Sequence, residues 1–195
     1  PGDYVFCEQK ERLGTGHAVK QAAPYLPDAG KTLVLYADVP LVSVKALKKL
    51  IASANRKKLS ILTAEVAEPK WYGRIIRDEN QDPIAIREEA DATKKEKAIK
   101  EIFTGIMVVE NEFLKKGLKG LLRNNNAGEY YLTDLVGFAS KRQLKIGSTQ
   151  TREREIYGVN NKEELARLYK SLISLNVEAA KKKGAIFKDE TTCYV

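Results

Sequence analysis

Apolar and polar positions change their spacing along the chain in a way that predicts strands and helices in turn. Four apolar runs have the length and composition of β-strands: residues 4–9, 32–36, 59–66 and 102–109. Other stretches have helical composition or apolar positions at helical spacing: residues 17–24, 43–51, 111–122 and 162–180. Strands that alternate with helices predict an α/β domain built on a mostly parallel sheet.

The stretch KTLVLYADVPL, residues 31–41, ends an apolar run with a carboxylate and a proline. The uninterrupted run over residues 32–36 is typical of a strand buried on both faces in a parallel sheet. Asp38 follows the carboxyl end of that strand, which is where ligands bind in open α/β sheets. Asp and Pro are also common turn residues, so Asp38 can equally start a turn with Pro40.

The segment PKWYGRIIRDENQDPIAIREE, residues 69–89, predicts a β-hairpin whose two strands flank a DENQD turn. Gly73 lies where the chain enters the first strand, and Glu88 ends the second. A glycine that lets the backbone approach a ligand, near a carboxylate that accepts hydrogen bonds from hydroxyls, suits a sugar pocket. A bulge glycine and a solvated glutamate explain the same residues equally well.

Two polar clusters at helix starts complete the candidates. Gly14, Thr15 and Gly16 precede an Ala-rich helix, so their N–H groups and hydroxyl can bind an anion or a base edge. Glycine is also common at the boundary before a helix, where it binds no ligand. Asn161 can cap the long C-terminal helix. Asn160 is not needed for that cap, and its amide oxygen is free to bind a cation.

The composition is that of an ordinary folded protein, with 43% hydrophobic and 31% charged residues over 195 positions. No apolar run approaches the roughly 20 residues of a bilayer span, and the first residues lack a signal-peptide pattern. The two cysteines lie at opposite ends and form no metal or redox spacing. We therefore expect a single domain, with at most a small appendage, in the cytoplasm and without a membrane partner.

The formal net charge of +8 and the pI near 9.3 raise the question of a polyanionic partner. Nucleic-acid binders usually cluster lysine and arginine on one element, with aromatic residues between them. Here the cations are scattered, and their one run, residues 181–183, falls at a predicted helix end, where cations complement the helix dipole. The charge pattern favours an anionic small-molecule substrate over nucleic acid.

Six motifs in order carry a resemblance to a known family: LGTGHAVKQAAP, LYADVPLVS, YGRI, EIFTGI, NNNAGEYYLTDLV and GVNN. They resemble the uridylyltransferase domain of bacterial bifunctional N-acetylglucosamine-1-phosphate uridyltransferase/glucosamine-1-phosphate acetyltransferases. The resemblance implies a Rossmann-like nucleotidyltransferase fold over residues 1–183, with a mostly parallel sheet, helices on both faces and a β-hairpin insertion. Residues 184–195 are similar to the start of the left-handed β-helix that carries the acyltransferase half in that family.

The resemblance also implies a site with a nucleotide end, a metal pair and a sugar end. Five residues form the nucleotide end: Gln9 bonds the uracil, Gly14 and Thr15 line the nucleotide-sugar site, and Tyr36 and Ala37 flank it. Asp38 and Asn160 hold Mg²⁺, whose preference for hard oxygen ligands and retained waters suits them. Gly73 and Glu88 contact the N-acetylglucosamine, and Glu129, Tyr131 and Thr133 lie in a motif near the sugar.

The implied reaction converts UTP and N-acetylglucosamine 1-phosphate into UDP-N-acetylglucosamine and pyrophosphate, a step toward peptidoglycan and lipopolysaccharide. This reaction needs no general base, because a phosphate monoester has a second pKa of about 6 and is already anionic near neutral pH. The enzyme must align two mutually repelling anions and neutralise the charge of the departing pyrophosphate, which Mg²⁺ and positive groups can do.

Several features depart from the family pattern. A glycine-rich loop with an arginine and a lysine that grip the triphosphate is expected before Pro1, so we expect this chain alone to be nearly inactive and one edge of its sheet to be unpaired or wrongly paired. Phe103 stands where the family usually has an asparagine that bonds the sugar, which puts the sugar specificity in question. Ala37 replaces a usual glycine, and its methyl group is tolerable at negative φ.

Two alternatives stay open beside the uridylyltransferase. The chain can belong to a nucleotidyltransferase for another sugar 1-phosphate, which Phe103 favours, or it can be a non-catalytic module on the same fold. In the family, trimers form through the β-helix. We therefore expect a monomer for this chain and a homotrimer for a longer protein that carries the β-helix.

Overall fold

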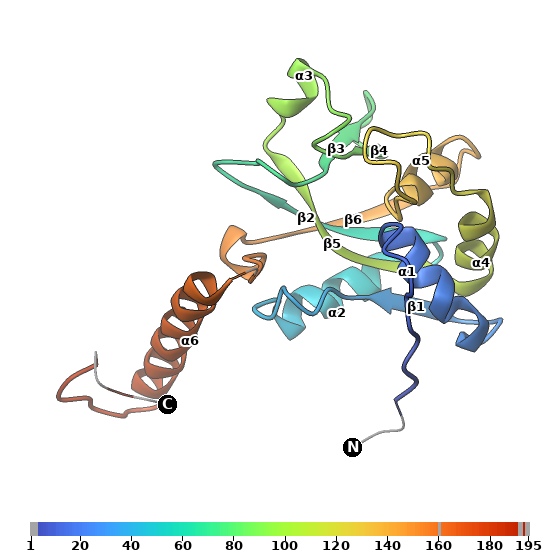
Figure 1. Cartoon of the computed structure of the whole chain (residues 1–195). Helices are drawn as coiled ribbons and strands as arrows, with labels where there is room; N and C mark the ends of the chain where they lie inside the picture. Colours follow the sequence, from blue (N-terminus) through green and yellow to red (C-terminus); the bar gives the residue numbers. More distant parts are fainter. Residues whose placement is uncertain (1–3, 160, 191–192, 194–195) are drawn as a thin grey trace.

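The structure is a computed structural model that describes residues 4–159, 161–190 and 193 (Figure 1). Within these residues a six-stranded sheet has the order β4-β3-β5-β2-β6, and β1 also pairs with β5. The strands are β1 (Lys31–Val34), β2 (Leu59–Glu65), β3 (Arg74–Arg77), β4 (Pro83–Arg87), β5 (Glu101–Glu110) and β6 (Ile146–Thr151). The helices are α1 (Thr15–Ala22), α2 (Val44–Ser53), α3 (Lys94–Lys97), α4 (Asn111–Gly120), α5 (Asp134–Ser140) and α6 (Lys162–Lys182), with 3₁₀ turns at Ala23–Tyr25 and Glu153–Glu155.

Strand direction corrects one expectation. In the described part of the chain only β2 and β6 pair in parallel, whereas β1, β2 and β3 all run antiparallel to β5. The prediction of a mostly parallel sheet is therefore wrong, although the α/β Rossmann-like class is confirmed. The antiparallel course of β5 follows from the segment between β2 and β5. This segment leaves the sheet and re-enters it at the same end, where the Val66 N–H donates to the Lys100 carbonyl at 3.1 Å. The hairpin and α3 thus reverse the chain where a crossover helix would have preserved its direction.

The two edges of β5 are paired differently. One edge meets β2 from Val109 to Glu101, with a single irregularity near Ile61. The other edge is shared, because β1 pairs with residues 107–110 and β3 pairs at Ile102. Between these partners lies Gly105, which has a φ of 85°. The chain leaving β1 and the chain entering β3 diverge at this point.

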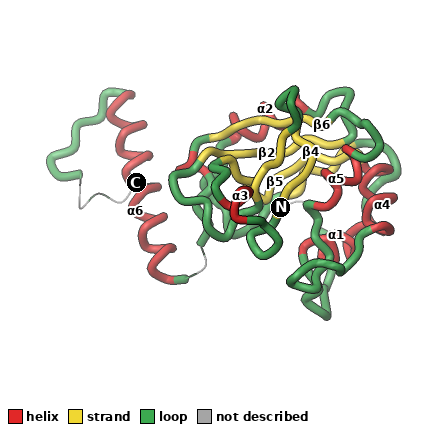
Figure 2. The backbone as a smooth tube through the Cα atoms, turned by 90° about the horizontal axis from the view of Figure 1, so that it is seen from above, coloured by secondary structure: helices red, strands yellow, loops and turns green. Residues whose placement is uncertain are grey.

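Helices cover both faces of the sheet, as predicted. Side chains alternate along β5, so that Phe103 and Met107 join the larger core with α4 and α5, while Ile106 and Val108 face α2. Figure 2 shows α2 on one side of the strands and α1, α4 and α5 grouped on the other. The sheet is therefore a buried central layer that fixes the positions of the loops at its ends.

Two predicted strands differ from the structure. Residues 4–9 form no strand, and Tyr4, Val5 and Phe6 are exposed, because no neighbouring strand in the described chain pairs with them. β1 is shorter than predicted and is not buried on both faces, since Lys31 is exposed and its remaining residues are half-buried. The strand β6 has no counterpart among the predicted elements, because its sequence IGSTQT has few apolar residues.

The predicted hairpin around residues 78–82 is confirmed.

The long helix α6 extends away from the sheet (Figure 1). Asn161 caps it as predicted, accepting a hydrogen bond from the Glu164 N–H at 2.9 Å. Its leucine stripe does not enter the core: Leu165, Leu172 and Leu175 are 53%, 41% and 40% exposed. No helix among the described residues has both the length and the apolar character needed to cross a bilayer. The boundary between residues 183 and 184 stays a prediction.

Candidate functional site

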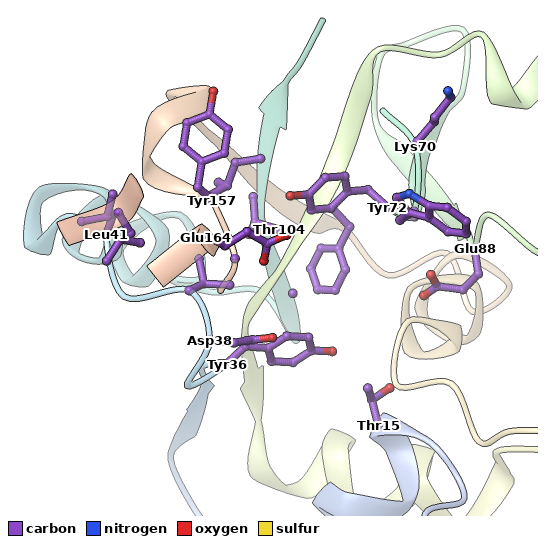
Figure 3. A pocket seen from close by; sticks show the side chains of 18 of the residues that line it. Thr15, Tyr36, Asp38, Leu41, Lys70, Tyr72, Glu88, Thr104, Tyr157 and Glu164 are labelled. Carbon is purple, nitrogen blue, oxygen red and sulfur yellow. The ribbon is translucent and has the colours of Figure 1, made fainter. Parts of the chain in front are cut away.

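A cavity of about 950 Å³ opens where β1 and β3 diverge along β5 (Figure 3). Its walls come from segments far apart in sequence: Thr15, Glu88 and residues within 36–41, 70–73, 103–105, 129–131, 156–158 and 164–171. Gly105 is essential to this geometry, because a Cβ atom there would lie 2.7 Å from the Tyr36 ring. The ring of Tyr36 can rest on β5 because residue 105 has no side chain.

Asp38 lies in the loop that leaves β1 and lines the cavity. The N–H of Val39 donates to the Tyr36 carbonyl at 3.3 Å, so Asp38 is inside a tight turn as well as in the site. Asp38 therefore stands third in a turn over residues 36–39 and does not start one with Pro40, and its role in binding stays a prediction. Its carboxylate is exposed, and no other described residue forms a hydrogen bond or ion pair with it.

A segment 121 positions away in sequence meets this turn. The backbone N–H of Val159 donates to the Asp38 carbonyl at 2.9 Å, and Gly158 and Tyr157 also line the cavity. Asn160, the second predicted metal ligand, lies outside the described residues, so the pairing of Asp38 with Asn160 stays a prediction.

The donors on this side suit magnesium chemistry. Mg²⁺ takes hard oxygen ligands, keeps several waters and commonly binds through one or two carboxylates together with substrate phosphates. The uncommitted Asp38 carboxylate at the cavity wall fits that pattern. Among the described residues, no three histidine, cysteine, aspartate or glutamate side chains gather as a group that could hold a metal.

Glu88 forms the wall near the hairpin. Its Oε1 accepts a hydrogen bond from the Thr133 hydroxyl at 2.7 Å. Burial raises the pKa of Glu88 and nearby carboxylates, Asp134 first, raise it further, while the hydrogen bond from Thr133 lowers it. A Cβ atom on Gly73 would lie 3.2 Å from Glu88 Oε2 and 2.7 Å from the Ile86 side chain. Gly73 is therefore needed because Glu88 and Ile86 fill the space where a side chain would go.

Three predicted residues follow one another after the NNNAG loop and serve different purposes. Glu129 and Tyr131 line the cavity. Burial, the adjacent carboxylates and a hydrogen bond with Asp91 raise the pKa of Tyr131 to about 12. Thr133 is 3% exposed and does not line the cavity; it holds Glu88 in place.

The predicted nucleotide end is only partly in the cavity. Thr15 lines it, and its hydroxyl accepts a hydrogen bond from the Leu132 N–H at 3.1 Å. Gln9 and Gly14 lie behind Thr15, where the Gln9 amide donates to the Gly14 carbonyl at 3.1 Å. The N–H of Gly16 donates to the Tyr130 carbonyl at 2.8 Å, so this group is not free to bind an anion.

Two departures from the family pattern can be located. Phe103 is 5% exposed, lines the cavity and belongs to the larger core. Its ring therefore places an apolar surface where a hydrogen-bonding side chain was expected. Ala37 is exposed, does not line the cavity and has no positive φ, which meets the condition for replacing a glycine.

The sequence reasoning missed several cavity residues. Lys70, Trp71 and Tyr72 line the cavity from the turn before β3, and Arg167 lines it from α6. In the sequence they look like a turn and a solvated helix face. The signal that could have found them is their position immediately before Gly73 and just after Asn161, next to residues already selected.

Comparison with known proteins identifies the family. The model of the family described as Nucleotidyl transferase matches residues 3–164. The chain belongs to the nucleotidyl transferase family. Its curated relatives include the bifunctional protein GlmU of Neisseria meningitidis, 46% identical over 188 residues, and that of Idiomarina loihiensis, 39% identical. Both alignments cover 96% of this chain and 41% of the relative, so the chain spans about two fifths of the length of these proteins, in their N-terminal part.

Solved structures of nucleotidyl transferases have the same fold. A UDP-glucose pyrophosphorylase complexed with UDP-glucose aligns with a TM-score of 0.59 and 17% identity, covering 73% of this chain and 56% of its own. A nucleoside-diphosphate-sugar pyrophosphorylase from Vibrio cholerae aligns with a TM-score of 0.62 and 11% identity, covering 83% and 66%. At these identities the likeness establishes the fold alone.

Proposed function

We propose that the cavity binds UTP and N-acetylglucosamine 1-phosphate and forms UDP-N-acetylglucosamine and pyrophosphate. One observation carries the proposal: Asp38, Glu88 and Thr15 reach a single cavity from three separate segments (Figure 3). A free carboxylate suits a phosphate-bound cation, and a buried carboxylate held by a hydroxyl suits a sugar. The GlmU relatives support this choice among nucleotidyl transferases.

The chemistry is a phosphoryl transfer between two anions. An oxygen of the sugar phosphate attacks the α-phosphorus of UTP, and the bond from that phosphorus to the bridging oxygen of pyrophosphate breaks. No proton has to be removed, because the sugar phosphate is already ionised near neutral pH. The cavity must therefore bring the two phosphates together and offset their charge.

We assign each wall of the cavity a part in that task. Asp38, with Asn160, would hold Mg²⁺, which when bound offsets charge on the phosphates. Lys70 and Arg167 line the cavity, and their positive charges would offset the negative charge of the phosphates. Glu88 and Tyr131 offer an acceptor and a donor to sugar hydroxyls, and Thr15 borders the nucleotide.

Turnover and binding test different parts of the proposal. We expect the 195-residue chain to bind UDP-N-acetylglucosamine but to turn over poorly, because the triphosphate grip belongs to the glycine-rich segment that the resemblance places before Pro1. Joined to that segment, the chain should release pyrophosphate from UTP when Mg²⁺ and N-acetylglucosamine 1-phosphate are present. If the longer chain releases no pyrophosphate with any sugar 1-phosphate, the non-catalytic module is the correct function.

Phe103 favours a second candidate, a nucleotidyltransferase for another sugar 1-phosphate. Its buried ring faces the cavity and cannot donate or accept a hydrogen bond. A site that lacks one hydrogen-bonding group loses discrimination toward the sugar that needs it. Comparing kcat/KM for glucose 1-phosphate and N-acetylglucosamine 1-phosphate decides between the two, and a preference for glucose 1-phosphate would reject the first candidate.

Two further proposals concern the longer protein. We propose that it forms a homotrimer through a β-helix after residue 183, and that it works in the cytoplasm on the route to cell-wall precursors. The GlmU relatives support a further domain after residue 183, because each is longer than this chain and is named bifunctional. Sedimentation of the longer protein tests it, and a monomer would contradict it.

A further inference from the structure

The turn before β3 holds a tryptophan in a backbone conformation that tryptophan rarely adopts. The Tyr72 N–H donates to the Pro69 carbonyl at 3.3 Å, which closes a four-residue turn with Trp71 in third place. The φ of Trp71 is 72°. Glycine or asparagine normally occupies a turn position with positive φ, because a bulky side chain is strained there. Such strain tends to occur at functional sites.

Trp71 differs from the other strained residues of the described chain. Arg56, Gln81 and Gln143 also have positive φ, but they are polar and none of them lines the cavity. Trp71 is 87% exposed and lines the cavity, and it is the only tryptophan in the sequence. An exposed aromatic ring that lines a cavity and is held there at the cost of backbone strain suits contact with a ligand.

The turn is anchored on both sides, so the ring projects from a fixed base. Arg74 is 1% exposed; its guanidinium donates to the Tyr72 carbonyl and to the Glu89 carboxylate, the latter at 2.5 Å. On the other side, the Lys100 ammonium donates to the Ala67 carbonyl. These contacts hold the backbone against the strain at Trp71.

The neighbours of Trp71 indicate which part of the substrate it would contact. It lies two residues before Gly73, whose missing side chain makes room for Glu88. Lys70 and Glu88 lie on the same side of the cavity in Figure 3, and Thr15 lies on a different side. Under the proposed function, this is the sugar end and Thr15 borders the nucleotide.

We propose that the Trp71 indole is a stacking platform for the sugar ring, and this assignment rests on the proposed function. One face of a pyranose ring presents C–H bonds with partial positive charge, and the face of an indole is electron-rich. Stacking adds affinity through apolar contact and leaves the hydroxyls free for Glu88. It also offers a contact to the sugar that Phe103 cannot make by hydrogen bonding.

The single tryptophan makes the assignment directly measurable in the 195-residue chain. UDP-N-acetylglucosamine should change the intrinsic fluorescence of Trp71, whereas UDP, which lacks the sugar, should leave it nearly unchanged. Calorimetry on the same samples measures both affinities independently. If UDP changes the fluorescence as much as UDP-N-acetylglucosamine does, the indole meets the nucleotide and the assignment is overturned.

Variants separate stacking from folding. Trp71→Gly relieves the positive φ, so it should fold at least as stably as the parent yet bind UDP-N-acetylglucosamine about tenfold more weakly, with unchanged affinity for UDP. Trp71→Phe should retain most of the affinity. Gln81→Gly relieves the same strain in the hairpin loop and should change neither affinity.

Two results contradict the assignment in different ways. Equal UDP-N-acetylglucosamine affinity for the parent chain and Trp71→Gly removes the stacking role and leaves the proposed function intact. If the parent chain shows no binding of UDP-N-acetylglucosamine by calorimetry, the proposed function fails and the role of Trp71 fails with it.

Discussion

The two edges of β5 compare a continuous pairing with an interrupted one. Along one edge β2 follows β5 from Glu101 to Val109 with one irregularity between Ile61 and Thr63, and the pair is buried on both faces. Along the other edge β1 and β3 each take one end, and the cavity opens between them at Gly105. Continuous pairing satisfies the backbone and contributes stability, whereas the interruption gives a ligand access to the strand. Substitutions on the two edges should therefore affect different properties.

The largest loss of stability should follow a substitution on the continuous edge. Leu62 on β2 lies at the one irregularity in that pairing and is fully buried in the core under α2. Leu62→Ala should lower the free energy of unfolding by about 3 kcal/mol, because it removes apolar contacts and leaves a cavity. Urea titration measures the loss, and the exposed Val44→Ala on α2 is the control, expected within about 0.5 kcal/mol of the parent. Loss of UDP-N-acetylglucosamine affinity in folded Leu62→Ala would contradict the separation of the two edges.

The two proposed metal ligands, Asp38 and Asn160, should show the reverse behaviour. Asp38→Asn and Asn160→Ala in the longer chain should each lower turnover about 100-fold or more, because the phosphates lose their bound cation. The free energy of unfolding should change by less than about 0.5 kcal/mol. Pyrophosphate release at saturating Mg²⁺ measures the first effect, and Asp28→Asn, which lies outside the cavity, is the matched control. Near-parental turnover in either variant would remove it from the proposed site.

Gly105 should affect both the stability of the fold and the binding of the ligand. Gly105→Ala should lower the free energy of unfolding by about 2 kcal/mol, since the φ of 85° strains an alanine and its Cβ would meet the Tyr36 ring. It should also weaken UDP-N-acetylglucosamine binding, because Tyr36 has to move. Gly137→Ala in α5, where no atom lies within 4 Å of the added Cβ, is the control and should be neutral or slightly stabilising. Unchanged stability in Gly105→Ala would show that the edge tolerates a side chain there.

The smallest effect should come from the charge of Glu88, whose pKa is raised by burial. A raised pKa in the folded state means that the stabilising contribution is present when the group is protonated and is lost as the pH rises through the folded pKa. Glu88→Gln should thus match the parent near pH 4 and exceed its stability by about 1 kcal/mol or less near pH 8. Thermal unfolding across this range measures the difference. A Glu88→Gln variant that is less stable than the parent at high pH would show that hydrogen bonds to the ionised carboxylate outweigh the cost of burying its charge.

Local patterns predicted individual elements better than their directions. The hairpin and the Asn161 cap are confirmed, because turn residues and capping residues act within a few positions. The antiparallel course of β5 was not predictable from its own composition, since it depends on where the hairpin insertion leaves and re-enters the sheet. The prediction of a strand at residues 4–9 was wrong for a related reason, because residues with high β-propensity form a strand only beside a neighbouring strand.

The site was predictable where a residue followed a strand. Asp38 and Glu88 were selected by their places next to predicted strands, and both line the cavity. Thr133 was selected as part of a motif near the sugar; it does not line the cavity, and its hydroxyl donates a hydrogen bond to Glu88. Trp71 was missed because its one sequence signal is its position two residues before Gly73, and its strain is visible only in the backbone angles.

The hydrogen bond from the Val159 N–H to the Asp38 carbonyl joins the last fifth of the chain to its first fifth. A second hydrogen bond, from the Ser43 N–H to the Glu155 carboxylate at 3.1 Å, joins the same two segments. Exchange of these two amide protons with deuterated solvent therefore reports how often the segments separate. A spectroscopist who follows both resonances would observe the opening of this side of the pocket without adding any ligand.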